Sequence, residues 1–425
     1  MDGRGQGPAY GRDGRRRVRR GGRGGALAVA LLAAATAVTA LTGAAPAGAG
    51  GTAGKSAAHP PGWQSRQAAG PRRDEELRAV AARGPGDAWS AGYREEPSGL
   101  DVPVAEHFDG FGWHATAGLG HLAGGTRIGQ LDDVLPLRRT DVWAVGSWND
   151  QPAHQDRSLA EHWDGRAWRE VALPAEPADR SAYPSALAGV RRDDVWAVGT
   201  TAQDRIGTPK PLAYHWNGRA WSSVATPEPG GDALLLDAAA DGRGTVWAVG
   251  TVYDAQGAGR PLTERWDGRS WRIVPAPHTA GRGESLESVA VLAPDDVWAV
   301  GVSSTPDGTP RPLALHWNGR TWSAVAVPDV PVDLHAVTAY GRHVLIALGE
   351  RQGAATPAYT MRWDGGRWLP EPAATDPAGA GASLFGVAAV PHPHPGGPSA
   401  WAVGSTLPRF DPPWRPIVQA YTTGR

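Results

Sequence analysis

The sequence contains no cysteine, and only two methionines and four phenylalanines among its 425 residues. The absence of cysteine excludes disulfides, a thiolate metal site, a cysteine nucleophile and an anchor built on an acylated cysteine. A surplus of charge is also lacking, because the formal net charge is −1. Beyond the N-terminus we therefore expect no basic face that follows phosphates, no nucleic-acid partner and no cofactor.

Long helical patterns are missing as well. The chain has 58 glycines and 38 prolines spread along its length, and after position 80 they interrupt every 3.6-residue periodicity before it reaches the length of a typical helix. What the chain does have is 20 tryptophans, which can supply a large buried apolar area without disulfides. The composition predicts an all-β protein rich in turns.

The N-terminus has the pattern of an export signal. Seven arginines lie within residues 11–25, an uncharged run follows over 26–43, and small residues at 47–49 suit a signal peptidase. We therefore expect a signal peptide over 1–48, a flexible linker over 49–60, and a secreted, extracellular protein without stable membrane insertion after cleavage. The Sec and Tat routes both stay open, and an uncleaved anchor is the alternative.

One motif organises the rest of the chain. It reads Asp-Val-Trp-Ala-Val-Gly at 194–199, and a second motif, Pro-Leu-Ala-Tyr-His-Trp-Asn-Gly-Arg-Ala-Trp, follows at 211–221. Versions of the first motif recur at intervals of 48 to 55 residues, centred on Trp89, Trp143, Trp196, Trp247, Trp298, Ile346 and Trp401. Seven copies at a nearly fixed period indicate a repeat architecture.

Each repeat is expected to form four short strands. In the third copy these are 186–190, 195–200, 212–216 and 221–225, and burial is expected to fall from the first two strands to the last. Asn-Gly or Asp-Gly joins the last two strands, which predicts a hairpin with the positive φ angles of a type I′ turn. Four antiparallel strands per period of about fifty residues predict a β-propeller.

The last copy lacks its fourth strand, because the chain ends soon after a strand at 416–423. The missing strand has a counterpart near the start of the repeats, where Gly62-Trp63 and its following residues resemble Ala220-Trp221. Trp63 precedes Trp89 by 26 residues, as Trp221 precedes Trp247. We predict that this N-terminal strand completes the last blade and closes a seven-bladed propeller over 61–425.

The paired motifs are similar to the kelch repeat of galactose-oxidase-like propellers. In that repeat an apolar strand ends in Gly-Gly, and an aromatic residue and a tryptophan follow at fixed offsets. Here the second glycine is replaced by Ser147, Thr200, Thr251 or Val302, so the match is kelch-like. The resemblance implies an architecture over about 60–425. The copper-radical chemistry of galactose oxidase needs a Tyr-Cys crosslink, which a chain without cysteine cannot form.

Two regular sets of side chains invite functional interpretations. The residue before the third-strand aromatic is His107, His162, His215, Arg265, His316 or Arg362. One residue per blade cannot converge on a metal within the roughly 2 Å that zinc requires, so we predict a packing role for this set, and for the tryptophans in register with it. His392 and His394 are too few for a metal site. We predict no metal.

The predicted ligand face consists of the irregular loops between second and third strands and between successive blades. Its candidate ligand-binding residues are Tyr93, Trp148, Asp150, Asp204, Arg205, Tyr253, Asp254, Arg311 and Trp414. Aromatic, acidic and basic side chains together suit a glycan or an extracellular protein. No catalytic group stands out, so we expect a monomeric, non-catalytic binding module. The alternative is an extracellular carbohydrate-active enzyme, a hydrolase or lyase.

Overall fold

The computed structural model describes residues 62–69, 74–119, 127–150, 155–177, 180–203, 208–279, 283–340, 344–351, 358–374, 381–407 and 415–423. All of them belong to one compact unit that spans 32–425. The expected signal peptide and most of the region before the first strand lie outside the described residues. Within the part that is described, no helix has the length and apolar character needed to span a bilayer.

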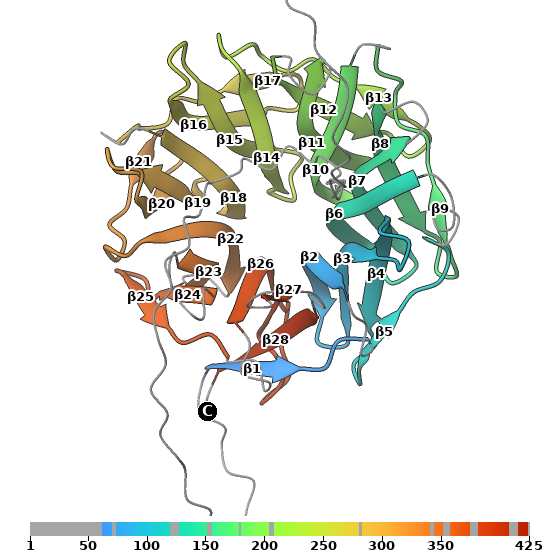
Figure 1. The fold of residues 1–425 in the computed structure, drawn as a ribbon. Coiled ribbons are helices and arrows are strands. Elements are labelled where there is room, and N and C mark those ends of the chain that lie inside the picture. The colour runs from blue at the N-terminus through green and yellow to red at the C-terminus, as the bar shows by residue number, and fades with distance from the viewer. Residues whose placement is uncertain are drawn as a thin grey trace, which may run out of the picture. The chain divides into compact units, whose positions relative to one another are not determined.

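The described strands form seven four-stranded antiparallel sheets, the blades, which follow one another around a ring (Figure 1). Blade 1 contains β2 (Glu75–Gly84), β3 (Asp87–Glu95), β4 (Asp101–Phe108) and β5 (Trp113–Ala115), from the innermost strand outward. Blade 2 contains β6 (Arg127–Arg138), β7 (Asp141–Asp150), β8 (Gln155–Trp163) and β9 (Trp168–Glu170). Blade 3 contains β10 (Arg180–Arg191), β11 (Asp194–Gln203), β12 (Lys210–Trp216) and β13 (Trp221–Ser223).

Blade 4 contains β14 (Ala233–Ala240), β15 (Val246–Tyr253), β16 (Gly259–Trp266) and β17 (Trp271–Ile273). Blade 5 contains β18 (Gly283–Ala293), β19 (Asp296–Ser304), β20 (Pro310–Trp317) and β21 (Trp322–Ala324). Blade 6 contains β22 (Val332–Tyr340), β23 (Val344–Arg351), β24 (Ala358–Trp363) and β25 (Trp368–Glu371). Blade 7 contains β26 (Gly381–Ala389), β27 (Ala400–Leu407) and β28 (Pro416–Thr422). The seven-bladed propeller predicted from the repeats is confirmed.

The fourth strand of blade 7 is β1 (Gly62–Arg66), which pairs antiparallel with β28 from Gly62 opposite Thr422 to Arg66 opposite Val418. Figure 1 shows this N-terminal strand at the outer edge of the C-terminal blade. The closure predicted from the position of Trp63 is therefore confirmed. We call the junction between blade 7 and blade 1 the seam, because the two ends of the propeller chain meet there.

Tryptophans of the repeated motif pack the blades together. Trp143, which is 1% exposed, contacts Trp216 and Trp221 of the next blade at ring-centroid distances of 4.9 and 5.2 Å. The same three-ring contact joins Trp89 to Trp163 and Trp168, Trp196 to Trp266 and Trp271, Trp247 to Trp317 and Trp322, and Trp298 to Trp363 and Trp368. The predicted packing role of the tryptophans is confirmed.

The glycine that ends the motif is required by a neighbouring strand. Every innermost strand has a register shift that leaves one residue unpaired, which is a β-bulge. In blade 1 the bulged residue is Arg78, and the backbone there brings the carbonyl oxygen of Glu76 against the motif glycine. A Cβ on Gly92 would lie 1.9 Å from this oxygen. Across the seven blades this distance is 1.8–2.1 Å, which no side chain could tolerate.

The hairpins between third and fourth strands differ from the expected type I′ turn. Trp216 pairs with Trp221, so four residues form the loop, and Asn217 Oδ1 accepts hydrogen bonds from the backbone N–H groups of Arg219 and Ala220 at 3.0 and 3.1 Å. Gly218 has a φ of 89°, whereas a type I′ turn would also need a positive φ at Asn217. The hairpin was predicted correctly, and the side-chain bonds of asparagine or aspartate select a longer loop.

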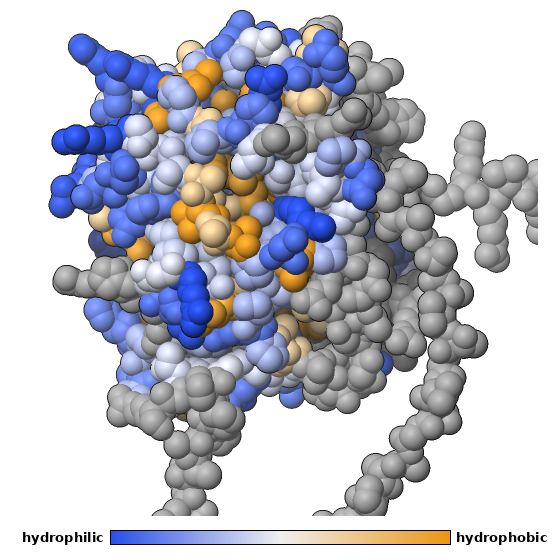
Figure 2. All heavy atoms as spheres, turned by 90° about the vertical axis from the view of Figure 1, so that its left-hand side faces the viewer, coloured by the Kyte–Doolittle hydropathy of each residue, from blue (hydrophilic) through white to orange (hydrophobic). Residues whose placement is uncertain are grey.

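The outer rim of the ring is less buried than its inner part. Each of the short fourth strands β5, β9, β13, β17 and β21 has one buried tryptophan followed by two exposed residues. Figure 2 shows the side of the molecule on which β21 and β25 lie, where apolar patches alternate with strongly hydrophilic side chains. This follows the predicted decrease of burial from the first strands to the last.

Candidate functional site

Four of the nine predicted ligand-binding side chains cannot be placed. Asp204, Arg205 and Trp414 lie outside the described residues, and so does the side chain of Asp150, whose backbone ends β7. The remaining five come from four different blades. Their assignment as a ligand site therefore stays a prediction, although the structure gives each of the five a local environment.

Trp148 does not lie in an exposed loop as expected. It belongs to β7, is 8% exposed, and packs in the apolar cluster of Leu131 and Leu159. The expectation placed it in a loop because polar residues follow it, but pairing with β6 continues to Asp150. The guanidinium of Arg157 lies 5.9 Å from the centroid of its ring, so this indole is covered on its outer side.

The other four predicted residues are engaged locally. Asp254 Oδ1 accepts N–H groups from Gln256 and Ala258 at 3.0 and 2.9 Å, and these backbone hydrogen bonds lower the pKa of its carboxyl. Arg311 Nε lies 2.7 Å from Asp329 Oδ1. Tyr93 and Tyr253 are half-buried at the ends of their strands.

Burial raises the pKa of both phenols, with the charge of Glu76 acting on Tyr93 and that of Glu287 acting on Tyr253. Both tyrosines therefore stay neutral and can offer hydroxyl groups for hydrogen bonding at physiological pH.

The row of histidines has the predicted structural role. Nε2 of His107, His162, His215 and His316 lies 2.8–3.0 Å from Oδ1 of the aspartate that begins the motif of the same blade. Each imidazole also lies against the motif tryptophan, at centroid distances of 4.3–4.5 Å. Within the described residues, no group of three or more His, Asp or Glu is placed to hold a metal ion.

Charged residues of the innermost strands were not singled out from the sequence. Arg78 Nε of blade 1 lies 3.3 Å from Asp132 Oδ1 of blade 2, and both are bulge residues. Asp133 Oδ2 accepts the Leu187 N–H of the following blade at 2.7 Å, and Asp237 Oδ2 accepts that of Val289 at 2.8 Å. The last two aspartates therefore connect successive blades.

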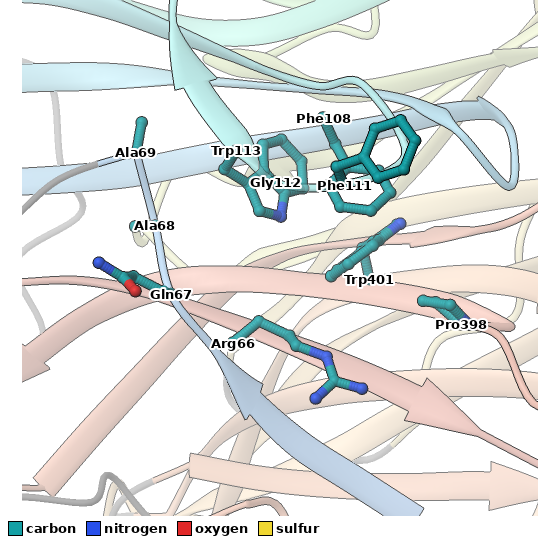
Figure 3. Close-up of a pocket in the computed structure, with 10 residues that line it drawn as sticks. All are labelled: Arg66, Gln67, Ala68, Ala69, Phe108, Phe111, Gly112, Trp113, Pro398 and Trp401. Atoms are coloured by element: carbon teal, nitrogen blue, oxygen red, sulfur yellow. The ribbon is translucent and has the colours of Figure 1, made fainter.

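One cavity in the described part of the chain lies at the seam. It has a volume of about 450 Å³ and is lined by Arg66, Gln67, Phe108, Phe111, Trp113 and Trp401, together with small residues and Pro398. Figure 3 shows the rings of Phe111 and Trp113 on one side of this seam pocket, Arg66 on the other and Trp401 between them. Phe111 is 97% exposed, although large apolar side chains are normally covered.

Substitutions at repeated positions explain why the seam is open. The residue three after a fourth-strand tryptophan is Val171, Val224, Val274 or Val325 at four junctions, where it packs in the same apolar cluster as the next blade's tryptophan. At the seam this residue is Arg66, which is exposed and donates from Nη2 to Gln64 Oε1 at 3.0 Å. The groove that valine fills elsewhere is therefore left open beside Trp113.

Two further departures from the repeat shape the same pocket. The third-strand aromatic is tryptophan in blades 2 to 6 but the smaller Phe108 in blade 1. The hairpin tip, which carries Arg166, Arg219, Arg269 or Arg320 in blades 2 to 5, carries Phe111 in blade 1. Sequence reasoning could have found this site, because Phe111 is visible as an aromatic residue at a position where the repeat has arginine.

The wall of the pocket contains a buried hydrogen-bond donor without a partner among the described residues. Trp113 is 5% exposed, and its indole nitrogen has no hydrogen-bond partner among the described residues. In the next blade Trp168 Nε1 donates to Thr116 Oγ1 at 2.8 Å. Arg66 is at the position equivalent to Thr116, and a guanidinium has no acceptor to offer. The accessible donors of the seam pocket are therefore those of Arg66 and Gln67.

The turns that line the pocket lie on the side of the ring opposite to the loops between second and third strands, whereas Gln67 belongs to the connection between blades 7 and 1. Phe111 belongs to a turn between third and fourth strands, and Pro398 to the connection between the first two strands of blade 7. Because the strands of a blade alternate in direction, both kinds of turn lie on one side, and the loops that join second to third strands lie on the other. We call the side with the pocket the turn face.

Comparisons with known proteins assign the chain to no family. No family model and no curated protein matches the chain. A chain of a mitotic checkpoint complex is 12% identical with a TM-score of 0.49, covering 91% of this chain and 100% of that one. YCF48 from Cyanidioschyzon merolae is 12% identical, with a TM-score of 0.47 and coverage of 85% and 98%.

The SapL1 lectin, solved in complex with alpha methyl fucoside, is 14% identical, with a TM-score of 0.44 and coverage of 71% and 97%. The chain is a seven-bladed β-propeller. Likeness at this level assigns it no ligand, and the kelch-like family expected from the repeat stays a prediction.

Proposed function

We propose that this protein is a binding module that takes a carbohydrate in the seam pocket. The observation that carries the proposal is an open pocket lined by aromatic rings, with Phe111 fully presented to solvent and with Arg66 and Gln67 at its edge. Binding pockets commonly combine apolar and aromatic walls with a few polar groups that orient the ligand. A volume of about 450 Å³ is enough for one or two sugar units.

The chemistry of the lining favours a sugar over a purely apolar ligand. A pyranose ring presents C–H groups on its faces and hydroxyl oxygens around its edge. The faces can lie on the exposed ring of Phe111, while the oxygens accept hydrogen bonds from Arg66 and from the Gln67 amide. The ligand face expected from the sequence is thereby moved from the loops between second and third strands to the turn face.

The extracellular location of the protein is also part of the proposal. The expected signal peptide lies outside the described residues, so secretion is a proposal that rests on the arginine-rich and apolar N-terminal pattern. Outside the cell, a propeller without disulfides would hold its pocket rigid through its tryptophan contacts, and a rigid pocket loses little entropy on binding.

The test uses substitutions that the chain itself supplies. Arg66→Val copies the valine of four other junctions and should fill the pocket, and Phe111→Arg copies the other hairpin tips. The wild-type protein is screened on an array of neutral and charged glycans, and the best ligand is titrated by calorimetry. We expect each variant to bind it at least about tenfold more weakly. A matched control, Arg219→Phe, adds an exposed aromatic residue at a closed junction and should bind like the wild type.

Two results would contradict the proposal. One is an array without any bound glycan, and the other is unchanged affinity in Arg66→Val when its melting temperature is at least that of the wild type. The same samples test the enzyme alternative, because incubation of the bound glycan with the protein should produce no new reducing ends. Steady release of reducing ends would instead identify a hydrolase or lyase.

A further inference from the structure

A second cavity on the turn face is rich in arginine. It has a volume of about 550 Å³ and lies where blades 2 and 3 meet, with Arg138 at the end of β6, Arg191 at the end of β10 and Arg192 in the turn that follows. Val190 and the turn residue Gly218 complete the wall, and Asp193 is the single acidic residue in it. We call it the arginine pocket. It shares no lining residue with the seam pocket.

The three guanidinium groups keep donors available for a ligand. Arg138 has no ion pair among the described residues. Arg192 Nε lies 3.7 Å from Asp141 Oδ2, a long contact, and 69% of its side chain is exposed. Arg191 Nη2 donates to Asp194 Oδ2 at 2.9 Å and its Nε lies 3.8 Å from Asp193 Oδ1, while 67% of its side chain is exposed.

The acidic partners are themselves shared. Asp141 and Asp194 are the motif aspartates, and Oδ1 of each is already bonded to His162 or His215 at 2.8 and 2.9 Å. A carboxylate that also accepts a bond from an imidazole neutralises a neighbouring arginine less completely. The lining itself contains three arginines and one aspartate, and the exposed guanidinium groups of Arg138 and Arg192 stay accessible to an anionic ligand.

This charge is a departure from the repeat. At three and two residues before the motif aspartate, blades 2 and 3 have Arg138-Arg139 and Arg191-Arg192. Blade 5 has Ala293-Pro294 at the same positions, and the sequences that follow, Asp-Asp-Val-Trp-Ala-Val-Gly, are identical in blades 3 and 5. The fold of this turn does not need arginine, so a structural role does not account for the pair.

We propose that the arginine pocket binds a carboxylate-bearing sugar unit, such as a uronic acid residue of an acidic polysaccharide. The planar guanidinium fork matches a carboxylate with two parallel hydrogen bonds. Val190, at 47% exposure, gives the C–H face of the sugar an apolar contact. An acidic peptide is disfavoured because the lining consists of strand ends and turns and offers no strand edge for backbone pairing.

This site goes beyond the proposed function, and neither depends on the other. Both pockets open on the turn face, so an acidic polysaccharide chain could use the aromatic seam pocket for one unit and the arginine pocket for another. The two sites can be separated by experiment, since Arg66→Val should leave uronate binding at the arginine pocket unchanged and Arg191→Ala/Arg192→Pro should leave the seam pocket unchanged.

The test titrates the full chain with trigalacturonic acid by calorimetry in 50 mM salt. We expect binding that weakens as the salt concentration rises, because the contacts are exposed ion pairs. The double variant Arg191→Ala/Arg192→Pro, which copies the turn of blade 5, should bind at least about tenfold more weakly. The neutral methyl ester of the same trisaccharide should also bind at least about tenfold more weakly to the wild-type protein.

Three outcomes would overturn the proposal. The first is an absence of trigalacturonate binding at millimolar concentration, and the second is unchanged affinity in the double variant. The third is inorganic phosphate or sulfate that binds as tightly as the trisaccharide, which would reduce the pocket to an adventitious ion only. If the double variant melts earlier than the wild type, Arg138→Ala, a change at an exposed side chain without an ion pair, decides between the same outcomes.

Discussion

Glu264 is a buried carboxyl group that has lost its partner. In blade 1 the equivalent residue, Glu106, accepts the Ala69 N–H from the segment that follows the preceding fourth strand, at 3.1 Å. Ala69 is six residues after Trp63, and six residues after Trp221 the chain has Pro227, which has no N–H. Glu264 is 0% exposed, and neither of its oxygens has a hydrogen-bond partner among the described residues.

Burial raises the pKa of Glu264 from 4.5 to about 8. Because the folded-state pKa lies above the unfolded one, the protonated form is favoured by folding. Full stability is present below about pH 4.5 and is lost as the pH rises through about 8. Each pH unit between these values costs about 1.4 kcal/mol, so that at pH 7 the free energy of unfolding is lowered by about 3 kcal/mol.

The chain supplies the replacement. Before blade 5 the residue six after Trp271 is also a proline, Pro277. The third strand of blade 5 has Leu315 at the position equivalent to Glu264. We expect Glu264→Leu to raise the free energy of unfolding by about 3 kcal/mol at pH 7 and by less than about 1 kcal/mol at pH 4.5. Urea unfolding followed by tryptophan fluorescence at several pH values measures both. A gain that is the same at all pH values, or a loss of stability, would refute the reasoning.

A matched control separates loss of charge from loss of a partner. Glu106→Leu removes the acceptor of the Ala69 N–H, so it should lower stability by about 1–3 kcal/mol at pH 7. In the wild-type background, Pro227→Ala restores an N–H opposite Glu264. It should therefore lower the pKa of that carboxyl and flatten the pH dependence of stability, which the same titration reports.

Two further predictions concern the ring itself. Gly92→Ala should lower the free energy of unfolding by about 3 kcal/mol or more, because its Cβ would lie 1.9 Å from a carbonyl oxygen. Gly84→Ala in the same blade places its Cβ in open space and should leave stability nearly unchanged. Thermal melting compares the two variants. A chain that starts at residue 75 lacks β1 and the buried Trp63, so it should melt several degrees below one that starts at residue 50. Equal melting temperatures would rule out a stabilising closure.

The fold could be predicted because the same sequence motif recurs in every blade. Seven copies of one motif gave the blades, and the tryptophan spacing around Trp63 gave the closing strand. Local details were harder. The end of β7 was placed too early, since a strand that continues through Trp148 into polar residues is determined by pairing with β6 and not by its own composition. The turn type was missed because side-chain hydrogen bonds of Asn217 decide it.

The candidate sites were partly visible in the sequence. Phe111 at a position of arginine, and Arg191-Arg192 at a position of Ala-Pro, are departures that an alignment of the repeats displays. The cavities beside them were not predictable, because they depend on the orientations that individual side chains adopt. Arg66 leaves its groove open by extending toward Gln64, and no pattern of residues specifies that orientation.

The bulge in each innermost strand has a consequence for how this ring can change. The unpaired residues are Arg78, Asp132, Ser185, Leu236, Glu287, His335 and Phe385, and all seven are half-buried and follow a fully buried residue. The steric demand of the bulge falls on the glycine of the adjacent strand, so the bulged position itself tolerates every chemical type. The innermost strands therefore present seven equivalent positions whose side chains differ from blade to blade while the glycines hold the backbone in place, and the ion pair of Arg78 with Asp132 couples two of them.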